Sequence, residues 1–281
     1  MAVRFTIQPT RLVSSSPASV PLISGLRAFW GSLRYEFWMQ ARRYSLWIVF
    51  ALLAAFVLRN FDSLLSDPFI TSARQASFRW ATLVAEFFPL GAGLLMADRF
   101  TRDRATHMAE LLDVTAATPL GRLLGKYLGA TLATLVPIFL VYLVGVVLIA
   151  AHWADLSVFL PALGAFAATT VVGVLFVSAF SIACTTVMWP LLYQFLFVGY
   201  WFWGNLLNPK VGIPTLNGTI LTPDGHFVLA GFFSPPPGVV LGYGQASSPL
   251  IALESLGALL SCAAPAVLAA WVWLRWQAAH Q

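Results

Sequence analysis

Residues 98–129 read DRFTRDRATHMAELLDVTAATPLGRLLGKYLG and gather charge in a chain that has little of it elsewhere. Only 10% of the 281 residues are charged, yet five of the sixteen lysines and arginines lie in this segment. The charged residues are Arg99, Arg102, Arg104, Arg122, Lys126, Asp98, Asp103, Glu110 and Asp113. Because apolar stretches lie on both sides, we expect the segment to be a water-exposed connection on which a soluble protein can dock.

The composition excludes an ordinary soluble domain, since 59% of the residues are hydrophobic and the mean hydropathy is +0.80. A helix needs roughly 20 apolar residues to cross a bilayer. Six stretches meet or approach that length: Tyr44–Asn60, Trp80–Ala97, Leu123–Ala151, Leu156–Met188, Trp189–Leu207 and Ile251–Leu274. Backbone groups in lipid must be bonded internally, so these stretches are expected to be helices. The fourth is too long for one straight crossing, and we expect it to tilt, kink or project from the bilayer.

The predicted fold is therefore all-α and polytopic, with six transmembrane helices, an N-terminal interfacial helix and a small extracytoplasmic loop subdomain. Residues 1–24 are expected to form a flexible cytoplasmic tail and residues 25–281 a single transmembrane domain. The two cysteines, Cys184 and Cys262, lie inside spans and show neither a disulfide framework nor a metal motif.

The distribution of basic residues predicts the orientation in the membrane. With the N-terminus inside and six crossings, only Arg59, Arg74, Arg79 and Lys210 lie outside, and the other twelve of the sixteen are cytoplasmic. Cytoplasmic loops carry the excess of lysine and arginine, so both termini are expected in the cytoplasm. This bias accounts for the net charge of +5 without a nucleic-acid partner.

An amphipathic pattern precedes the first span. Apolar residues recur there at helical spacing: Leu26, Phe29, Trp30, Leu33, Phe37 and Ala41. The pattern favours a helix in the headgroup layer over a frayed extension of the first span. The predicted interfacial anchors, which contact membrane lipid, are Trp30, Arg34, Arg42, Arg43, Arg122 and Lys126.

The long loop at residues 208–250 is expected on the outer side. Within it, residues 219–221 and 227–229 are apolar and flank Pro223-Asp224-Gly225. Proline presets φ, aspartate bonds its neighbour and glycine tolerates positive φ, so this triplet predicts a turn. A small hairpin is expected there.

Within residues 98–126, three structural features are expected. Opposite charges four residues apart, Asp98 with Arg102 and Arg99 with Asp103, predict that the second-span helix continues into the cytoplasm. Thr118 and Pro119 are a good N-cap and first helical residue, so a new helix is expected to start there. Between these two features lies a short amphipathic helix suited to docking in a groove, formed by Met108, Leu111 and Leu112 with His107, Glu110 and Asp113 beside them. The alternative is that these charges serve only as topology anchors around a solvated loop.

These residues resemble a known family. The motifs Arg104-Ala105-Thr106, Glu110-Leu111-Leu112, Thr118-Pro119 and Gly125-Lys126-Tyr127-Leu128-Gly129 are similar to the intracellular loop of bacterial ATP-binding cassette exporter permeases. The group concerned is the six-span family that includes polysaccharide, drug and antibiotic exporters. Ala105 stands where glycine is commoner in that family, and the outer loop is longer than usual.

The resemblance implies a permease subunit in the bacterial cytoplasmic (inner) membrane. It would work with a second permease, as a homodimer or a heterodimer, and with separate cassette ATPase subunits to export an unidentified substrate. The resemblance places a coupling helix near His107–Val114, with His107, Glu110, Leu111, Leu112 and Asp113 as ATPase contacts. The chain itself is not expected to be an enzyme. Residues 121–127 are one residue short of a phosphate-binding loop, and Tyr127 replaces its Ser/Thr.

Glu86 is the intramembrane polar candidate, about six residues and roughly 9 Å into the second span. One interpretation is a functional carboxylate, and the other is a residue near the outer interface satisfied by Arg79 or Arg74. No catalytic, cofactor or metal constellation is visible in the sequence. Two other functions remain open: a non-transporting membrane scaffold or sensor, and an ion-coupled carrier that uses Glu86.

Overall fold

The regular secondary structure in the described part of the chain is entirely helical. The computed structural model describes residues 22–98, 119–207, 212–236, 239 and 248–280, and no strand occurs among them. The elements are α1 (Leu22–Ala41), α2 (Tyr44–Arg59), α3 (Phe61–Leu65), α4 (Ala73–Met96), α7 (Pro119–Trp153), η1 (Leu156–Val158), α8 (Phe159–Phe166), η2 (Ala167–Val171), α9 (Val172–Val187), α10 (Pro190–Trp201), η3 (Phe202–Leu206), α11 (His226–Phe233) and α12 (Pro249–Ala279). The all-α prediction is confirmed for these residues.

Several of the described helices have the length and composition of membrane spans. Leu120–Trp153, Leu156–Val187 and Pro249–Gln277 qualify individually, and Gly25–Ala41 with Tyr44–Arg59 forms a fourth candidate bent by 60°. These helices support a multi-pass membrane protein.

The structure supports the six-span prediction only in part, because α4 and α10 are not among these candidates. Arg79 and Glu86 lower the mean hydropathy of α4. The predicted fifth span is divided into α10, with 12 residues, and the π-helical η3, with 5.

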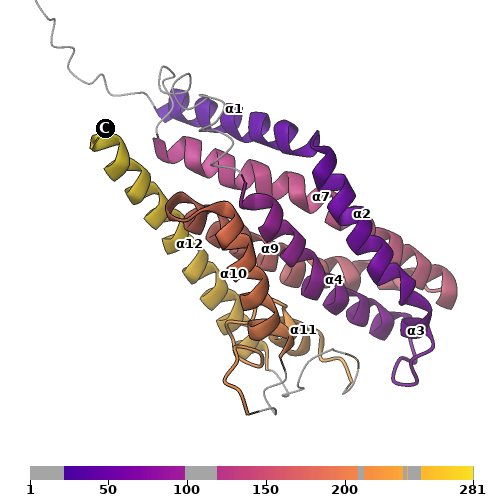
Figure 1. Cartoon of the computed structure of the whole chain (residues 1–281). Coiled ribbons are helices and arrows are strands. Elements are labelled where there is room, and N and C mark those ends of the chain that lie inside the picture. The colour runs from indigo at the N-terminus through magenta and orange to yellow at the C-terminus, as the bar shows by residue number, and fades with distance from the viewer. Residues whose placement is uncertain (1–21, 99–118, 208–211, 237–238, 240–247, 281) are drawn as a thin grey trace, which may run out of the picture.

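The bundle is organised around α4, which packs against α2, α7, α9 and α10. Figure 1 shows α4 running through the middle of the bundle, antiparallel to α7. The indole N–H of the fully buried Trp80 donates to the Tyr142 carbonyl oxygen on α7 at 3.0 Å. The absence of a side chain at Gly145 makes room for this indole. One buried hydrogen bond and one glycine therefore fix how α4 sits on α7.

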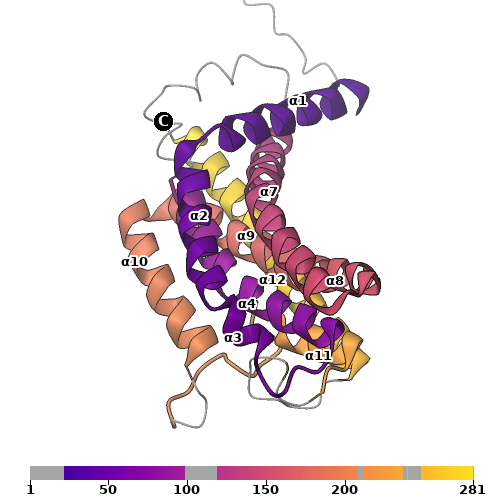
Figure 2. The ribbon, with the colours of Figure 1, turned by 90° about the vertical axis from the view of Figure 1, so that its right-hand side faces the viewer.

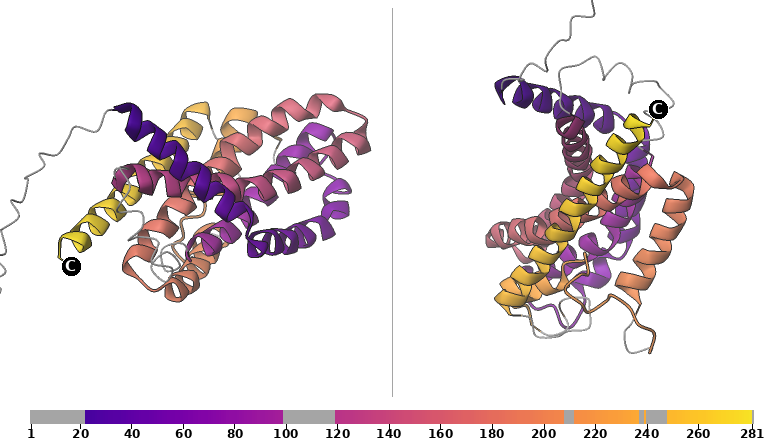
Figure 3. Two further views of the ribbon diagram at one scale, coloured as in Figure 1. Left: turned by 90° about the horizontal axis from the view of Figure 1, so that it is seen from above. Right: turned by 90° about the vertical axis from the view of Figure 1, so that its left-hand side faces the viewer.

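The first helix lies across one end of the bundle and packs on the beginning of α7 (Figure 2, Figure 3). Gly125 and Gly129, one turn apart on α7, allow this close approach. A Cβ on Gly125 would lie 2.8 Å from Ser32 Cβ, and one on Gly129 would lie 2.5 Å from the Leu33 carbonyl oxygen. Small residues spaced four apart let two helix backbones approach closely. The two glycines are thus a helix-packing motif.

The boundaries of the predicted cytoplasmic segment are only partly described. Pro119 is the first residue described after residue 98 and already belongs to α7, so the predicted helix start at Thr118-Pro119 stays a prediction. The helix α4 ends at Met96, before the charge pairs that were expected to prolong it. Of the two charge pairs, only Asp98 is described, because residues 99–118 lie outside the described residues.

The fourth predicted span deviates from a regular α-helix in its middle, where η2 is π-helical. A π-bulge adds a residue to one turn and is one identifiable cause of helix distortion. The turn at Pro223–Gly225 packs directly against this region, since a Cβ on Gly173 would lie 2.6 Å from the Pro223 carbonyl oxygen. The part of the chain before α11 therefore reaches the bundle itself.

The hairpin prediction is wrong. Residues 227–229 belong to α11, and Val228 and Leu229 are buried in its contacts with the bundle. The predicted turn does form, with Gly225 at φ 78°. It leads into a helix because the Asp224 side chain accepts the His226 N–H at 3.1 Å. A side chain that satisfies a free N–H at this point favours a helix start over a return strand.

Candidate functional site

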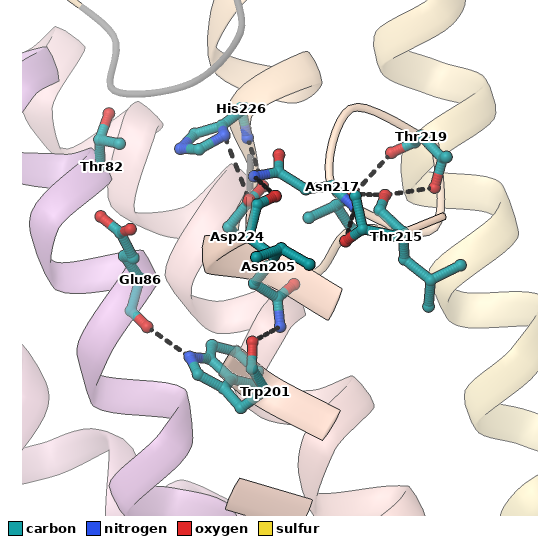
Figure 4. A network of polar contacts seen from close by, with 12 residues as sticks. Thr82, Glu86, Trp201, Asn205, Thr215, Asn217, Thr219, Asp224 and His226 are labelled. Atoms are coloured by element: carbon teal, nitrogen blue, oxygen red, sulfur yellow. Dashed lines mark hydrogen bonds and ion pairs between the residues drawn. The ribbon is translucent and has the colours of Figure 1, made fainter. Parts of the chain in front are cut away.

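Buried polar side chains gather where α4, η3 and the segment leading into α11 come together (Figure 4). The indole N–H of Trp201 donates to the Glu86 carbonyl oxygen at 2.9 Å, and Asn205 Nδ2 donates to the Trp201 carbonyl oxygen at 3.2 Å. Trp201 is fully buried. These two bonds connect the backbone of α4 at Glu86 to the end of α10 and η3.

Asp224 is the most deeply buried acid of the site, with 1% of its surface exposed. Its Oδ1 accepts the His226 N–H, and its Oδ2 lies 3.1 Å from His226 Nδ1. Gly225 between them adopts a left-handed conformation, and a Cβ there would lie 2.5 Å from Thr169 Cβ on η2. Only glycine adopts this conformation without strain and leaves that space free. Local chain geometry therefore fixes the position of Asp224.

The electrostatics of Asp224 are dominated by loss of hydration. Burial raises the pKa of the Asp224 carboxyl, because the charged form loses contact with water. His226 opposes this through its charge and its backbone hydrogen bond. The balance between the protonated and the charged form of Asp224 therefore depends on its burial first and on its contacts with His226 second.

Glu86, on α4, belongs to the same polar site and is partly buried (Figure 4). Neither of the two arginines proposed as its partners forms an ion pair with it among the described residues. Arg79 lies 3.7 Å from Asp67 and donates to the Val239 carbonyl oxygen at 3.4 Å, whereas Arg74 lies over the Phe78 ring at 5.6 Å. A functional role for Glu86 stays a prediction.

Two buried amide oxygens complete the site. Asn205 and Asn217 are 2% and 6% exposed, and the Oδ1 of each has no hydrogen-bond partner among the described residues. Nε2 of His226 likewise has none there. An unpaired buried polar atom costs about 1–3 kcal/mol. These amide oxygens lie in the same site as the carboxyl groups of Glu86 and Asp224. The site could therefore bind a water molecule, take up a proton, or accept a hydrogen bond from a polar ligand.

No group of three or more His, Cys, Asp or Glu side chains that could hold a metal ion occurs in the described ranges. The site is polar and ionisable, but the described residues do not form a metal centre.

The predicted ATPase contacts His107, Glu110, Leu111, Leu112 and Asp113 lie outside the described residues. Their role stays a prediction.

The interfacial anchors differ among themselves. Trp30, Arg34 and Arg42 are exposed, and Arg43 and Arg122 are partly exposed. Lys126 departs from the prediction of a side chain that reaches the headgroups, because it is only 8% exposed. It lies between Gly125 and Gly129 in the sequence, on the part of α7 against which α1 packs closely.

Glu86 is recognisable in the sequence as an acid within an apolar span, whereas the placing of Asp224, Asn205 and Trp201 in the same site is not. A signal was present for Asp224, since the Pro-Asp-Gly triplet was recognised as a turn. The burial of this turn against η2 is a tertiary effect that no local pattern shows.

No protein-family model matches the chain, and no curated protein matches it at a significant level.

Proposed function

We propose that this chain is the transmembrane permease subunit of an ATP-binding cassette exporter, which couples ATP hydrolysis by separate ATPase subunits to substrate efflux. The proposal rests on the position of the two helix ends that residues 98–118 connect, because these residues carry most of the family motifs. The end of α4 and the start of α7 lie at the same end of the bundle as α1 and the C-terminus of α12 (Figure 1). A segment tethered there can face a soluble ATPase together with both chain termini.

The course of the chain supports six crossings in this proposal. The stretches α2, α4, α7, η1–α9, α10–η3 and α12 follow one another back and forth between the two ends of the bundle (Figure 1). The basic residues described near the α1 end are Arg27, Arg34, Arg42, Arg43, Arg122, Lys126 and Arg275, and those near the other end are Arg59, Arg74 and Arg79. The positive-inside rule then places the α1 end and both termini in the cytoplasm.

The close packing of α1 on α7 suggests how motion would be transmitted. A coupling helix near His107–Val114 would be pushed by the closing ATPase subunits, and it leads directly into α7. Since α7 and α1 are joined through Gly125 and Gly129, the two helices would move as one body. A second permease copy would complete the translocation path. Coupling of this kind requires that the ATPase bind the two states of the permease with different free energies.

The proposal is tested by the double substitution Leu111→Glu with Leu112→Glu. We expect the protein to insert in the membrane but to lose its ATPase subunit during co-purification, because two charges replace the apolar contacts of a docking helix. The matched control is Ile220→Glu with Leu221→Glu, an exposed apolar pair near the opposite end of the bundle. If the Leu111/Leu112 variant retains the ATPase and substrate-stimulated hydrolysis, the coupling role is wrong.

A second candidate is an ion-coupled carrier, which the proximity of Glu86 to Asp224 and His226 favours. A carrier predicts substrate flux that requires an ion gradient, no ATPase partner, and loss of flux in Glu86→Gln. An exporter predicts flux that requires ATP and persists in Glu86→Gln. Transport by reconstituted protein under the two energy sources separates these functions.

A further inference from the structure

Residues 212–233, which we call the outer segment, are attached to several helices at the end of the bundle opposite α1 (Figure 1). Asn217 Nδ2 donates to the Leu207 carbonyl oxygen at 3.2 Å, directly after η3. Ser255 Oγ on α12 donates to the Ile220 carbonyl oxygen at 2.9 Å. The outer segment therefore bridges the end of α10–η3 and the beginning of α12.

A third attachment is the turn at Pro223–Gly225, which packs on η2 and the start of α9 and buries Asp224. The Asp224 Oδ2 atom lies 3.1 Å from His226 Nδ1, but it has no hydrogen-bond partner in the described part of the chain. Figure 4 shows the two side chains next to each other. Since no directed hydrogen bond joins Oδ2 to the imidazole, their contact is an attraction of charges. It is strong only while His226 is protonated.

Nothing else in the described ranges holds a proton on this imidazole. Nε2 of His226 is buried and has no hydrogen-bond partner there. The ionisable groups on the other helices near the turn are Glu86 and Arg79 on α4, Tyr200 on α10 and Glu254 on α12. Residues 159–183, which form α8, η2 and most of α9, contain no ionisable side chain.

None of these groups replaces His226 as the partner of Asp224. Arg79 is paired with Asp67 at 3.7 Å, and Glu254 is exposed. Tyrosine is uncharged near neutral pH, and Glu86 is another acid. An unpaired negative charge on Asp224 would therefore lie buried beside a second carboxyl group.

The number of protons on the pair decides whether its burial is favourable. With one proton the Asp224–His226 pair is neutral as a unit, and without it the pair carries one negative charge. A buried charge that has lost its partner is strongly destabilising. Histidine ordinarily changes its charge between about pH 5 and 8, and burial raises the pKa of the Asp224 carboxyl, which also favours keeping the proton. The attachment is thus stable near pH 6 and weakens as the pH rises toward about 8.

We propose that the Asp224–His226 pair is a proton-dependent latch, which holds the outer segment on the bundle while the pair keeps one proton and lets it separate when that proton leaves to water. Because the outer segment bridges several helices, its separation frees their ends to move apart. The latch is independent of what the chain transports and of the energy source. In the proposed orientation, the pH that controls it is that of the extracytoplasmic side.

The test is hydrogen–deuterium exchange of the purified full-length protein in lipid nanodiscs at about pH 6 and about pH 8, corrected for the pH dependence of intrinsic amide exchange. In the wild type, we expect the amides of residues 212–233 to exchange about tenfold faster at the higher pH. A difference of one unit in the pKa of the pair between the attached and the separated state changes the opening equilibrium about tenfold. The amides of α7 serve as an internal reference and are expected not to change. Equal corrected rates at the two pH values for the outer segment would refute the latch.

Three variants identify the group that binds the proton. His226→Gln has no imidazole to protonate, so its exchange is expected to be the same at both pH values. In Asp224→Asn the response is expected to reverse, with faster exchange at the lower pH, because a protonated imidazole is then buried without a counter-charge. The matched control is His152→Gln, which removes an exposed histidine from the last turn of α7 and is expected to respond like the wild type. If His226→Gln keeps the wild-type response, or if Asp224→Asn loosens the segment equally at both pH values, the pair is not the proton site.

Discussion

Replacing Gly129 with alanine should separate α1 from α7. The added Cβ would lie 2.5 Å from the Leu33 carbonyl oxygen and 2.9 Å from Glu36 Cβ. Carbon atoms in ordinary contact are about 3.5–4.0 Å apart. The nearest atom belongs to the backbone, so no change of rotamer can relieve the overlap. The helix α1 must therefore retreat by roughly 1 Å along this contact, which weakens the dispersion contacts that it makes there.

The size of the effect follows from two opposing contributions. Overpacking of this kind costs about 1–3 kcal/mol, whereas alanine is favoured over glycine in a helix by about 1 kcal/mol. We expect a net loss of up to about 2 kcal/mol in the free energy of unfolding, which places Gly129→Ala about 1–3 kcal/mol below a Gly→Ala change that causes no overlap. For a chain of this size, a loss of about 2 kcal/mol corresponds to a fall of roughly 4–8 °C in melting temperature.

The assay is thermal unfolding of the purified protein in detergent, with proteolytic cleavage of α1 as a second measurement. The control is Gly31→Ala on α1 itself, where an added Cβ meets nothing within 4 Å. That variant should be as stable as the wild type or more stable, because only the helix preference changes. If Gly129→Ala and Gly31→Ala have the same melting temperature and the same cleavage rate, the close α1–α7 contact does not exist.

Two further predictions concern the polar site. Trp201→Phe removes the 2.9 Å hydrogen bond to the Glu86 carbonyl oxygen and should lower the free energy of unfolding by roughly 1 kcal/mol from that bond alone, measured by thermal unfolding; an unchanged melting temperature would contradict the contact. Because burial raises the pKa of Asp224 above its ordinary 3.8, the charged form costs stability, and this cost grows as pH rises from about 4 through the folded-state pKa. Asp224→Asn should therefore gain melting temperature relative to the wild type as pH rises over that window; a variant that loses stability at neutral pH would mean that His226 stabilises the charged carboxylate.

Much of the helical structure could be predicted because the signals are local. The apolar run at residues 44–60 became α2, which ends one residue earlier at Arg59. The helix expected after Thr118 is present as α7 from Pro119 onward, the first residue described in that part of the chain. The start of α4 was predicted too late, at Trp80, although its signal is also local: the Ser72 side chain accepts the Gln75 N–H at 3.4 Å and caps the helix. Apolar length and capping act between residues close in sequence, so the sequence reports them directly.

The failures share one cause, which is contact between distant segments. Lys126 follows the pattern of a snorkelling residue, but it is buried on the part of α7 that packs against α1. Residues 227–229 suit a strand equally well, but they belong to α11, where Val228 and Leu229 are buried against the bundle. Neither outcome could be read from a window of neighbouring residues.

The sequence by itself determined an all-α membrane protein, the positions of most of its apolar helices, and a charged segment at residues 98–129 between two of them. The tertiary structure alone decided that Gly125 and Gly129 join α7 to α1 and that Asp224 lies buried near Glu86. The physical reason is that hydropathy and capping depend on neighbours along the chain, whereas burial, pairing and charge proximity depend on how each helix is rotated against the others.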